Sequence, residues 1–312
     1  MAVSKTKNRL EKTLPRVHSW ALGVSQYAPK PEFNYMEQYI NDQSKLFMAL
    51  DHLYDLGMHE VTKSLLTIEQ SRLTAATHMA HGFSRMLHSD GVDILRLKVK
   101  ESKVTTTSGL DAITHNMLGA IALGMPTLAK KLRQIVFTAL EQGYGVRNGR
   151  EDPGPWTLRY AAMGLSIIHD WLQIPLDLDK LGLPRDPAWG PLTKHWNTPD
   201  PVKLQSILYG ACDIHIERIA LTEREVNTGN FEFGNEYEAV HPTEILAVLR
   251  LRDMLNLPNP TLDHPLMNTP YAQITTTPGQ VTQPDSLLET FLAKARERDP
   301  EVMAEWDRVQ VD

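Results

Sequence analysis

The chain has 312 residues, of which 42% are hydrophobic and 22% charged, and its formal net charge is −6. This length is enough to bury a sizeable core, either as one large domain or as two packed subdomains. The negative charge argues against nucleic-acid binding, which depends on basic surfaces. Because Cys212 is the only cysteine, an intramolecular disulfide is excluded and a reducing compartment is indicated.

Targeting signals are not apparent in the sequence. The first residues, MAVSKTKNRLEK, are basic, but no apolar stretch of signal-peptide length follows them. Nowhere does the chain hold an uninterrupted apolar run of about 18 residues, the length that a membrane-spanning helix needs. We therefore expect a cytoplasmic protein that does not cross or bind a membrane.

The N-terminal part divides into an arm and the start of a helical domain. Residues 1–34 mix charged side chains with three prolines, which predicts an irregular arm with at most one short helix. From residue 35 the apolar residues recur at helical spacing, and this pattern extends to residue 270. Gly57 is expected to end the first helix. The first predicted helices cover 35–57, about 59–66 and about 71–86.

The segment 89–110 is predicted to be the least helical part of this domain, and a subdivision is expected near it. It is rich in β-branched and charged residues, which indicates an extended excursion or a short hairpin. Beyond it the pattern of helix, glycine or proline stop, and helix resumes, with Pro126 opening one helix and Gly143 ending it. The helices predicted here cover 110–123, 126–142 and 156–172.

The stretch 202–270 contains two amphipathic helices joined by an acidic connection. Asp200 and Pro201 predict the start of the first helix, with Asp as N-cap and Pro at the first helical position. The second helix follows Pro242 and ends at Pro258. Residues 271–312 are expected to form a linker and C-terminal helices. The fold class is therefore all-α, an array of antiparallel helical hairpins arranged as a solenoid or an orthogonal bundle, with little or no sheet.

Histidine spacing raises the question of a metal site. His78 and His81 lie three residues apart on one predicted helix face, and His115 would join them from another helix. Helical bundles build metal sites in this way, usually together with carboxylates. The chain contains neither a Glu-x-x-His nor a His-Glu-x-x-His motif. A satisfied histidine cluster explains the pattern better, so we expect no metal and no cofactor.

A second group resembles the polar set of a hydrolase. Asp213, His215 and Glu217 lie within one turn of each other, and His241 and Glu244 follow at the next helix. Residues two positions apart on a helix point in nearly opposite directions, so Asp213 and His215 cannot coordinate the same metal ion. Capping or inter-helix hydrogen bonds are the preferred interpretation. A nucleophile elbow is also lacking, and Cys212 is predicted mid-helix near an apolar face, so no catalytic residue is predicted.

The acidic connection at 222–238 is the predicted partner-binding surface. Its five glutamates face a single basic residue, Arg224, and they alternate with aromatic side chains. Such a surface suits a basic protein partner. A solvated loop anchored by its own aromatic residues is an equally valid interpretation. The predicted partner-binding residues are Glu223, Glu225, Glu232, Glu236, Glu238, Phe231, Phe233 and Tyr237.

Several phrases of the sequence resemble one family. They are GMPTLAKKLRQIVFTALEQGYG, GPLTKHWNTPDPVKLQSILYGACDIHIERI and HPTEILAVLRLRDMLNLPNPTLDHPLMNTPYA, and the similar portion is roughly Leu110 to Tyr271. Together they resemble the mostly helical immunity proteins encoded beside bacterial polymorphic toxins, including those of Rhs and type VI secretion systems. The residues that carry the resemblance are Trp196, Asp200, Pro201, Cys212, Asp213, His215, Pro242, Glu244, Ile245, Leu246 and residues 263–266.

The resemblance implies a cytosolic protein without enzymatic activity that binds one cognate toxin domain and occludes its active site. Two alternatives stay open on the residues alone. One is a metal-dependent helical hydrolase that uses the histidine and carboxylate groups described above. The other is a helical scaffold or adaptor, which would share every sequence feature with the immunity protein.

Overall fold

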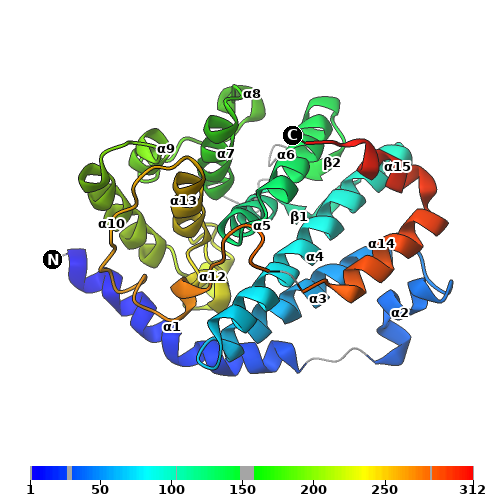
Figure 1. The fold of residues 1–312 in the computed structure, drawn as a ribbon, viewed down its shortest axis with the longest axis horizontal. Coiled ribbons are helices and arrows are strands. Elements are labelled where there is room, and N and C mark those ends of the chain that lie inside the picture. Colours follow the sequence, from blue (N-terminus) through cyan, green and yellow to red (C-terminus); the bar gives the residue numbers. More distant parts are fainter. Residues whose placement is uncertain (1, 27–29, 103, 148–157, 282, 312) are drawn as a thin grey trace.

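The computed structural model describes residues 2–26, 30–102, 104–147, 158–281 and 283–311. Within these ranges the fold is all-α, as predicted, apart from two short strands (Figure 1). The elements are α1 (Ala2–Ser25), η1 (Pro31–Phe33), α2 (Tyr35–Ile40), α3 (Leu46–Thr67), α4 (Arg72–Val99), β1 (Thr105–Gly109), α5 (Leu110–Ala122), α6 (Pro126–Gln142), β2 (Gly145–Arg147), α7 (Arg159–Leu172), α8 (Leu178–Leu181), α9 (Gly190–His195), α10 (Pro201–Glu217), α11 (Glu223–Val226), α12 (Glu236–Val240), α13 (Thr243–Met254), η2 (Tyr271–Gln273), α14 (Ser286–Arg298) and α15 (Pro300–Arg308).

The long helices α3 and α4 form an antiparallel hairpin that makes up one side of the molecule (Figure 1). They cross at Gly57 and Gly82, where the backbones come very close. A Cβ atom placed on Gly82 would lie 2.8 Å from the carbonyl oxygen of Gly57 and 3.1 Å from the backbone nitrogen of Val61. Gly57 therefore does not end a helix, contrary to the sequence-based prediction. It permits close packing within one continuous helix from Leu46 to Thr67.

Helix α5 lies at the centre, between this hairpin and the helices α7, α10 and α13 on the other side (Figure 1). It contacts α4, α6, α7 and α13, and each of its residues from Ile113 to Ala122 is buried. A helix that is buried all round is typical of a protein core. The apolar side chains of these helices join one continuous hydrophobic core.

Both ends of the described chain pack against distant parts of the fold. Helix α1 runs along one edge of the molecule and contacts α3, α10 and α12 (Figure 1). At the other end, the indole ring of Trp306 in α15 packs closely against Gly91. A Cβ atom added to Gly91 would lie 2.6 Å from this ring. The hydroxyl of Tyr39 donates to Asp299 over 2.6 Å, which ties α2 to the start of α15.

Two further predictions about helix boundaries differ from the structure. Residues 2–25, predicted as an irregular arm, form a helix that contains Pro15. The segment 89–110 was expected to be extended, but α4 continues through it to Val99 because its apolar side chains are buried in the core, and packing overrides the weak preference of β-branched residues. Only Thr105–Gly109 is a strand, paired in parallel with β2.

A buried arginine holds the end of α13 in place. Arg252 is fully buried, and its guanidinium donates to the carbonyl oxygens of Trp196, Thr198 and Pro258 and to the side chain of Asn259. The planar fork of donors matches these fixed acceptors, so the proline-rich segments around α13 keep one conformation. Along the described part of the chain, none of the helices combines the length and the apolar character that crossing a membrane requires.

The close crossing of α3 and α4 leads to a first prediction. We expect Gly82→Ala to lower the free energy of unfolding by about 1–3 kcal/mol, because the methyl group would force the two backbones apart. Gly210→Ala is the matched control, since Gly210 lies in α10 and a Cβ atom there meets nothing within 4 Å. That variant is expected to gain about 0.5–1 kcal/mol. Urea denaturation measures both, and equal effects of the two substitutions would contradict the packing argument.

Candidate functional site

A set of polar side chains from α5, α7, α10, α12 and α13 meets in the interior and is called here the interior cluster. Its histidines and Glu244 were singled out by the sequence as candidate ligands or catalytic groups. Each member is at most 6% exposed. The interior cluster consists of His115, Tyr160, His215, Tyr237, His241, Thr243 and Glu244.

The central contact of the interior cluster joins His215 of α10 to Glu244 of α13. Nδ1 of His215 lies 2.7 Å from Oε1 of Glu244, and Nε2 lies 3.2 Å from the carbonyl oxygen of Ala239. A carbonyl oxygen only accepts, so Nε2 carries a hydrogen and donates it. The imidazole ring stacks on Phe233 with a centroid distance of 3.8 Å. Both ring nitrogens are therefore satisfied, and the ring is fixed in orientation.

The remaining contacts of the interior cluster are hydrogen bonds between helices. The Tyr160 hydroxyl lies 2.8 Å from Oγ1 of Thr243 and donates to Oε2 of Glu244 over 3.3 Å. The Tyr237 hydroxyl lies 3.2 Å from Nδ1 of His115. His241 uses Nδ1 to donate to a backbone carbonyl, that of Tyr271, over 3.0 Å. The Nε2 atoms of His115 and His241 have no hydrogen-bond partner among the described residues.

Burial keeps His115, Tyr160, Tyr237 and His241 neutral around neutral pH. It lowers the pKa of His115 to about 3, helped by the nearby His241 and His215, and it lowers the pKa of His241 to about 4. Burial also raises the pKa of Tyr160 and Tyr237. A general acid or base works best when its pKa lies near the working pH. These shifts move His115, Tyr160, Tyr237 and His241 away from that range.

The hydrolase hypothesis uses Asp213, His215, His241 and Glu244, and the structure brings three of these four residues together. His215, His241 and Glu244 lie in the interior cluster and are 0% exposed. Asp213 lies on the outer side of α10, where its side chain is 51% exposed and 3.3 Å from Nε2 of His264. A substrate has no access to groups that are completely buried. The inter-helix hydrogen bonds preferred from the sequence describe His215 correctly.

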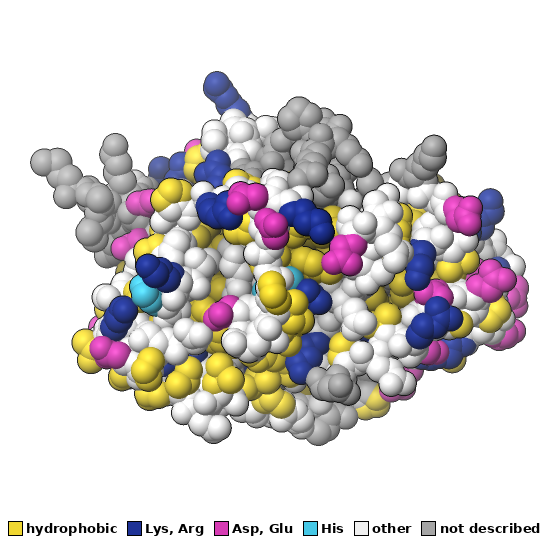
Figure 2. Space-filling model, turned by 90° about the horizontal axis from the view of Figure 1, so that it is seen from above, with side chains coloured by type: hydrophobic (Ala, Val, Ile, Leu, Met, Phe, Trp, Pro, Cys, Tyr) yellow, Lys and Arg dark blue, Asp and Glu magenta, His cyan; other side chains and the backbone are white. Residues whose placement is uncertain are grey.

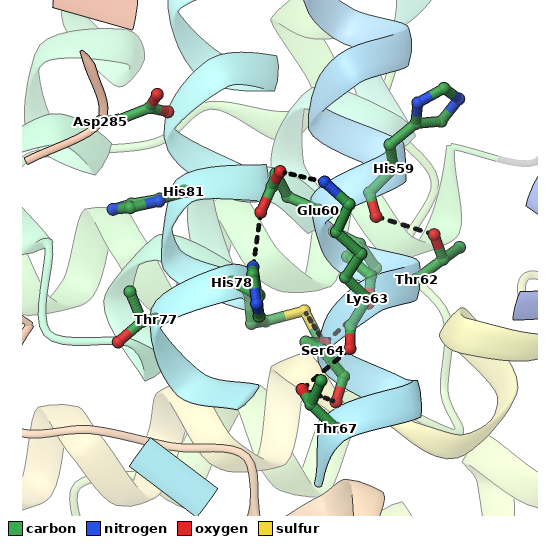
Figure 3. A network of polar contacts seen from close by, with 12 residues as sticks. His59, Glu60, Thr62, Lys63, Ser64, Thr67, Thr77, His78, His81 and Asp285 are labelled. Atoms are coloured by element: carbon green, nitrogen blue, oxygen red, sulfur yellow. Dashed lines mark hydrogen bonds and ion pairs between the residues drawn. The ribbon is translucent and has the colours of Figure 1, made fainter. Parts of the chain in front are cut away.

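A second polar site lies at the surface, between α3, α4 and the residues that precede α14, and is called here the Glu60 pocket (Figure 3). It is a pocket of about 340 Å³. Glu60, Arg85 and Asp285 form its polar floor, with side-chain exposures of 9%, 10% and 7%. His78 and His81 project from α4 into its wall.

Glu60 is the centre of this network. Its carboxylate accepts from Lys63 over 2.8 Å and from Nδ1 of His78 over 2.6 Å (Figure 3). It also lies 3.5 Å from the guanidinium of Arg85. Burial alone would raise the pKa of Glu60. The hydrogen bonds from His78 and Lys63, together with the charge of Arg85, outweigh burial and lower this pKa to about 2. Glu60 is therefore ionised at every physiological pH.

Arg85 connects this network to the C-terminal helices. Its Nε and Nη2 atoms donate to the two oxygens of Asp285 over 2.7 and 2.9 Å. Asp285 is also the N-cap of α14, since it accepts from the backbone N–H of Leu288 over 3.2 Å. The bidentate pair between Arg85 and Asp285 thus fixes both the floor of the pocket and the start of α14.

The histidine set proposed from sequence spacing is divided between the two sites. His78 and His81 belong to the Glu60 pocket, whereas His115 lies in the interior cluster. The side chains that the structure describes contain no group of three or more histidine, cysteine, aspartate or glutamate residues with the arrangement of a metal site.

Helix α1 binds the predicted partner-binding connection. The guanidinium of Arg9 makes two 3.0 Å hydrogen bonds with the carboxylate of Glu225 and donates to the carbonyl oxygen of Ile219 over 2.7 Å. One heptad later, Arg16 lies 3.5 Å from Glu236. The basic face of α1 therefore supplies the positive charge that this acidic segment was expected to take from a partner.

Other residues of the connection are anchored in the core. Glu232 pairs with Arg218 over 2.6 Å and accepts from the indole N–H of Trp189 over 3.0 Å. Phe233 and Tyr237 are buried. The carboxylate of Glu238 caps the backbone N–H of Gly234, and Phe231 packs under the guanidinium of Arg9 at 4.5 Å. The exposed member of the predicted set is Glu223.

Comparison with known proteins adds no relative. No family model matches the chain, and neither the curated proteins nor the solved structures gave a match.

Sequence reasoning missed most of the Glu60 pocket. One signal was present, because His78, His81 and Arg85 recur at three- and four-residue steps and therefore share a helix face. Glu60 and Asp285 gave no such signal. They reach Arg85 from residues 25 and 200 positions away.

The pair of His215 and Glu244 leads to a second prediction. His215→Ala and Glu244→Ala are each expected to lower the free energy of unfolding by about 3–5 kcal/mol, because each leaves a buried polar partner unpaired. The double variant should cost at least about 2 kcal/mol less than the sum, since both residues act through one contact. Urea denaturation of the four proteins measures this coupling. Strictly additive effects would mean that the contact does not contribute to stability.

A third prediction concerns acid stability. Free histidine titrates near 6.5, but the pKa of His241 in the fold is about 4. Between these values the unfolded chain binds more protons, so this residue lowers stability as the pH falls below 6.5. Compared with His241→Gln, the wild type should lose up to about 1.4 kcal/mol per pH unit in this range.

The control for that experiment has the opposite sign. Burial raises the pKa of Asp90 to about 7, so protonated Asp90 stabilises the fold at low pH and this contribution is lost as the pH rises toward 7. Compared with Asp90→Asn, the wild type should therefore gain stability as the pH falls. Urea denaturation between about pH 7.5 and 4.5 tests both signs. A pH-independent difference between wild type and His241→Gln would contradict the prediction.

Proposed function

We propose that this chain is an immunity protein, which binds a cognate secreted toxin in the bacterial cytoplasm and neutralises it by occluding the toxin's active site. The proposal starts from the phrases between Leu110 and Tyr271 that resemble such proteins. The observation that carries it is the complete burial of the interior cluster. The residues that looked most like catalytic groups stabilise the fold, which leaves the surface as the functional part of the molecule.

The burial argument separates binding from catalysis. His215, His241 and Glu244 have no exposed surface, and their hydrogen bonds connect α10, α12 and α13. An enzyme that used these residues would have to open its core before each turnover. A binding protein needs only a stable surface, and the same hydrogen bonds contribute to that stability.

The acidic connection gives the proposed interface a fixed shape. Arg9 and Arg16 of α1 hold Glu225 and Glu236, while Arg218 holds Glu232. An ordered surface loses less conformational entropy on binding than a mobile loop does. We place the partner contact on the outward face of this segment, around Glu223.

Long-range electrostatics would guide rather than dominate this association. Figure 2 shows basic and acidic side chains interspersed over one face of the molecule, with hydrophobic side chains exposed between them. Mixed charges of this kind favour a specific partner over general attraction to any polycation. The net charge of −6 nevertheless favours a basic partner.

Co-purification with the neighbouring gene products is the experiment that tests the function. The tagged chain is expressed with the product of the gene immediately upstream, and the two are expected to elute together as a tight one-to-one complex. The chain should also protect cells that express this toxin. Failure to bind or to protect against any toxin encoded beside it would overturn the proposal.

The fourth prediction locates the interface. Glu223→Lys is expected to weaken the complex about two- to fivefold without changing the melting temperature, because Glu223 is an exposed charge at the interface rim. Glu232→Lys should instead lower the melting temperature, since it places a cation against Arg218. Surface plasmon resonance and thermal denaturation measure the two effects. An unchanged affinity of Glu223→Lys would move the interface elsewhere.

A further inference from the structure

The hydrogen bonds of the Glu60 pocket determine which nitrogen of each histidine is free to bind a ligand. The ionised carboxylate of Glu60 accepts from Nδ1 of His78, so that nitrogen carries the hydrogen. In the neutral ring, Nε2 of His78 is then a bare acceptor. His81 has the opposite tautomer, because its Nε2 donates to the backbone carbonyl oxygen of Gln283 over 3.0 Å. Its free acceptor is Nδ1.

The floor of the pocket carries no excess positive charge. The guanidinium of Arg85 is matched by Asp285 at 2.7 Å and by Glu60 at 3.5 Å, and Lys63 is matched by Glu60 at 2.8 Å. The carboxylates of Glu60 and Asp285 therefore balance the positive charges of Arg85 and Lys63. Leu73 at the rim is 53% exposed and offers an apolar surface beside these groups.

We propose that the Glu60 pocket receives a lysine or arginine side chain of the cognate toxin, whose N–H groups donate to Nε2 of His78 and Nδ1 of His81. This inference rests on the function proposed above and adds a second contact to it. Lysine and arginine combine an apolar stem with a charged donor end. The stem would lie on Leu73, and the donor end would reach the two imidazoles.

An anionic ligand fits this pocket less well. Its oxygens would meet bare imidazole nitrogens, which have no hydrogen to donate, and the cations Lys63 and Arg85 are already paired with Glu60 and Asp285. A cationic and an anionic probe therefore distinguish the two kinds of ligand. The charged groups beside the two histidines are Glu60, Lys63, Arg85, Asp285 and Glu289.

The fifth prediction is tested on the full chain by NMR of its histidine Cε1–H groups. The cationic probe is N-acetyl-arginine methylamide, and the anionic control is N-acetyl-glutamate methylamide. At about pH 8 the cationic probe is expected to shift the signals of His78 and His81 saturably, with a dissociation constant on the order of 1–10 mM. The anionic probe is expected to cause no saturable shift. The His78→Gln and His81→Gln variants assign the two signals.

Two results would overturn the inference: no saturable shift with the cationic probe, or a shift caused by the anionic probe instead. The affinity of the toxin complex provides a second test. His78→Gln combined with His81→Gln should weaken it about tenfold, equivalent to about 1.4 kcal/mol. The matched control His18→Gln lies on the exposed side of α1 and should leave it unchanged.

The two tests, probe binding and toxin binding, distinguish failure of the inference from failure of the proposed function. If the toxin complex forms and the two pocket substitutions do not change its affinity, the pocket is not part of the interface. The inference is then wrong, while the proposed function stands. If the probe binds but no toxin complex forms with any neighbouring gene product, the function falls and the toxin is excluded as the occupant.

Discussion

The fold is built around a helix that water cannot reach. Because α5 is buried on every side, its polar side chains His115 and Asn116 must find partners in the protein. Tyr237 approaches His115 from α12, and Tyr54 accepts a hydrogen bond from Asn116 on the α3 side. The positions of the helices around α5 therefore satisfy two requirements. They cover its apolar surface, and they supply hydrogen-bond partners to its few polar groups.

The same demand explains why the chain's most reactive-looking residues have a structural role. His215 and Glu244 meet between α10 and α13, beside the part of α7 that carries Tyr160. A charged or strongly polar group that is buried without partners is costly, and a complete network removes that cost while fixing a single arrangement of helices. The Glu60 pocket has a different construction. Its carboxylates are equally well paired, but the free edges of His78 and His81 line a space that opens to solvent.

Local signals in the sequence predicted those parts of the fold that local chemistry determines. Asp200 with Pro201 starts α10, as their side chains require. Pro126 and Gly143 bound α6 in the same way. Predictions failed where packing overrides a local tendency, as at Gly57, which looked like a helix end and is a crossing point of two backbones.

The candidate sites also divide into features that the sequence reveals and features that only the folded structure reveals. Sequence spacing grouped His78 and His81 correctly, since they share one helix face, but it could not separate them from His115. The acidic connection was visible as a run of glutamates. Its main binding partner, Arg9 of α1, lies 216 residues away, and no periodicity links the two. Long-range pairs of this kind are specified only by the folded arrangement.

The contact between Arg9 and Glu225 also has a consequence for biosynthesis. The first helix of the chain is made long before the surface it covers, because 216 residues separate the two partners. At translation rates of about 5–20 residues per second, α1 waits on the order of 10–40 s for that surface to leave the ribosome. Helix α3 is already available during this interval, but the part of α1 that contacts α10 and α12 remains uncovered. An early stop in translation would therefore leave α1 with only the contact to α3 and without its contacts to α10 and α12.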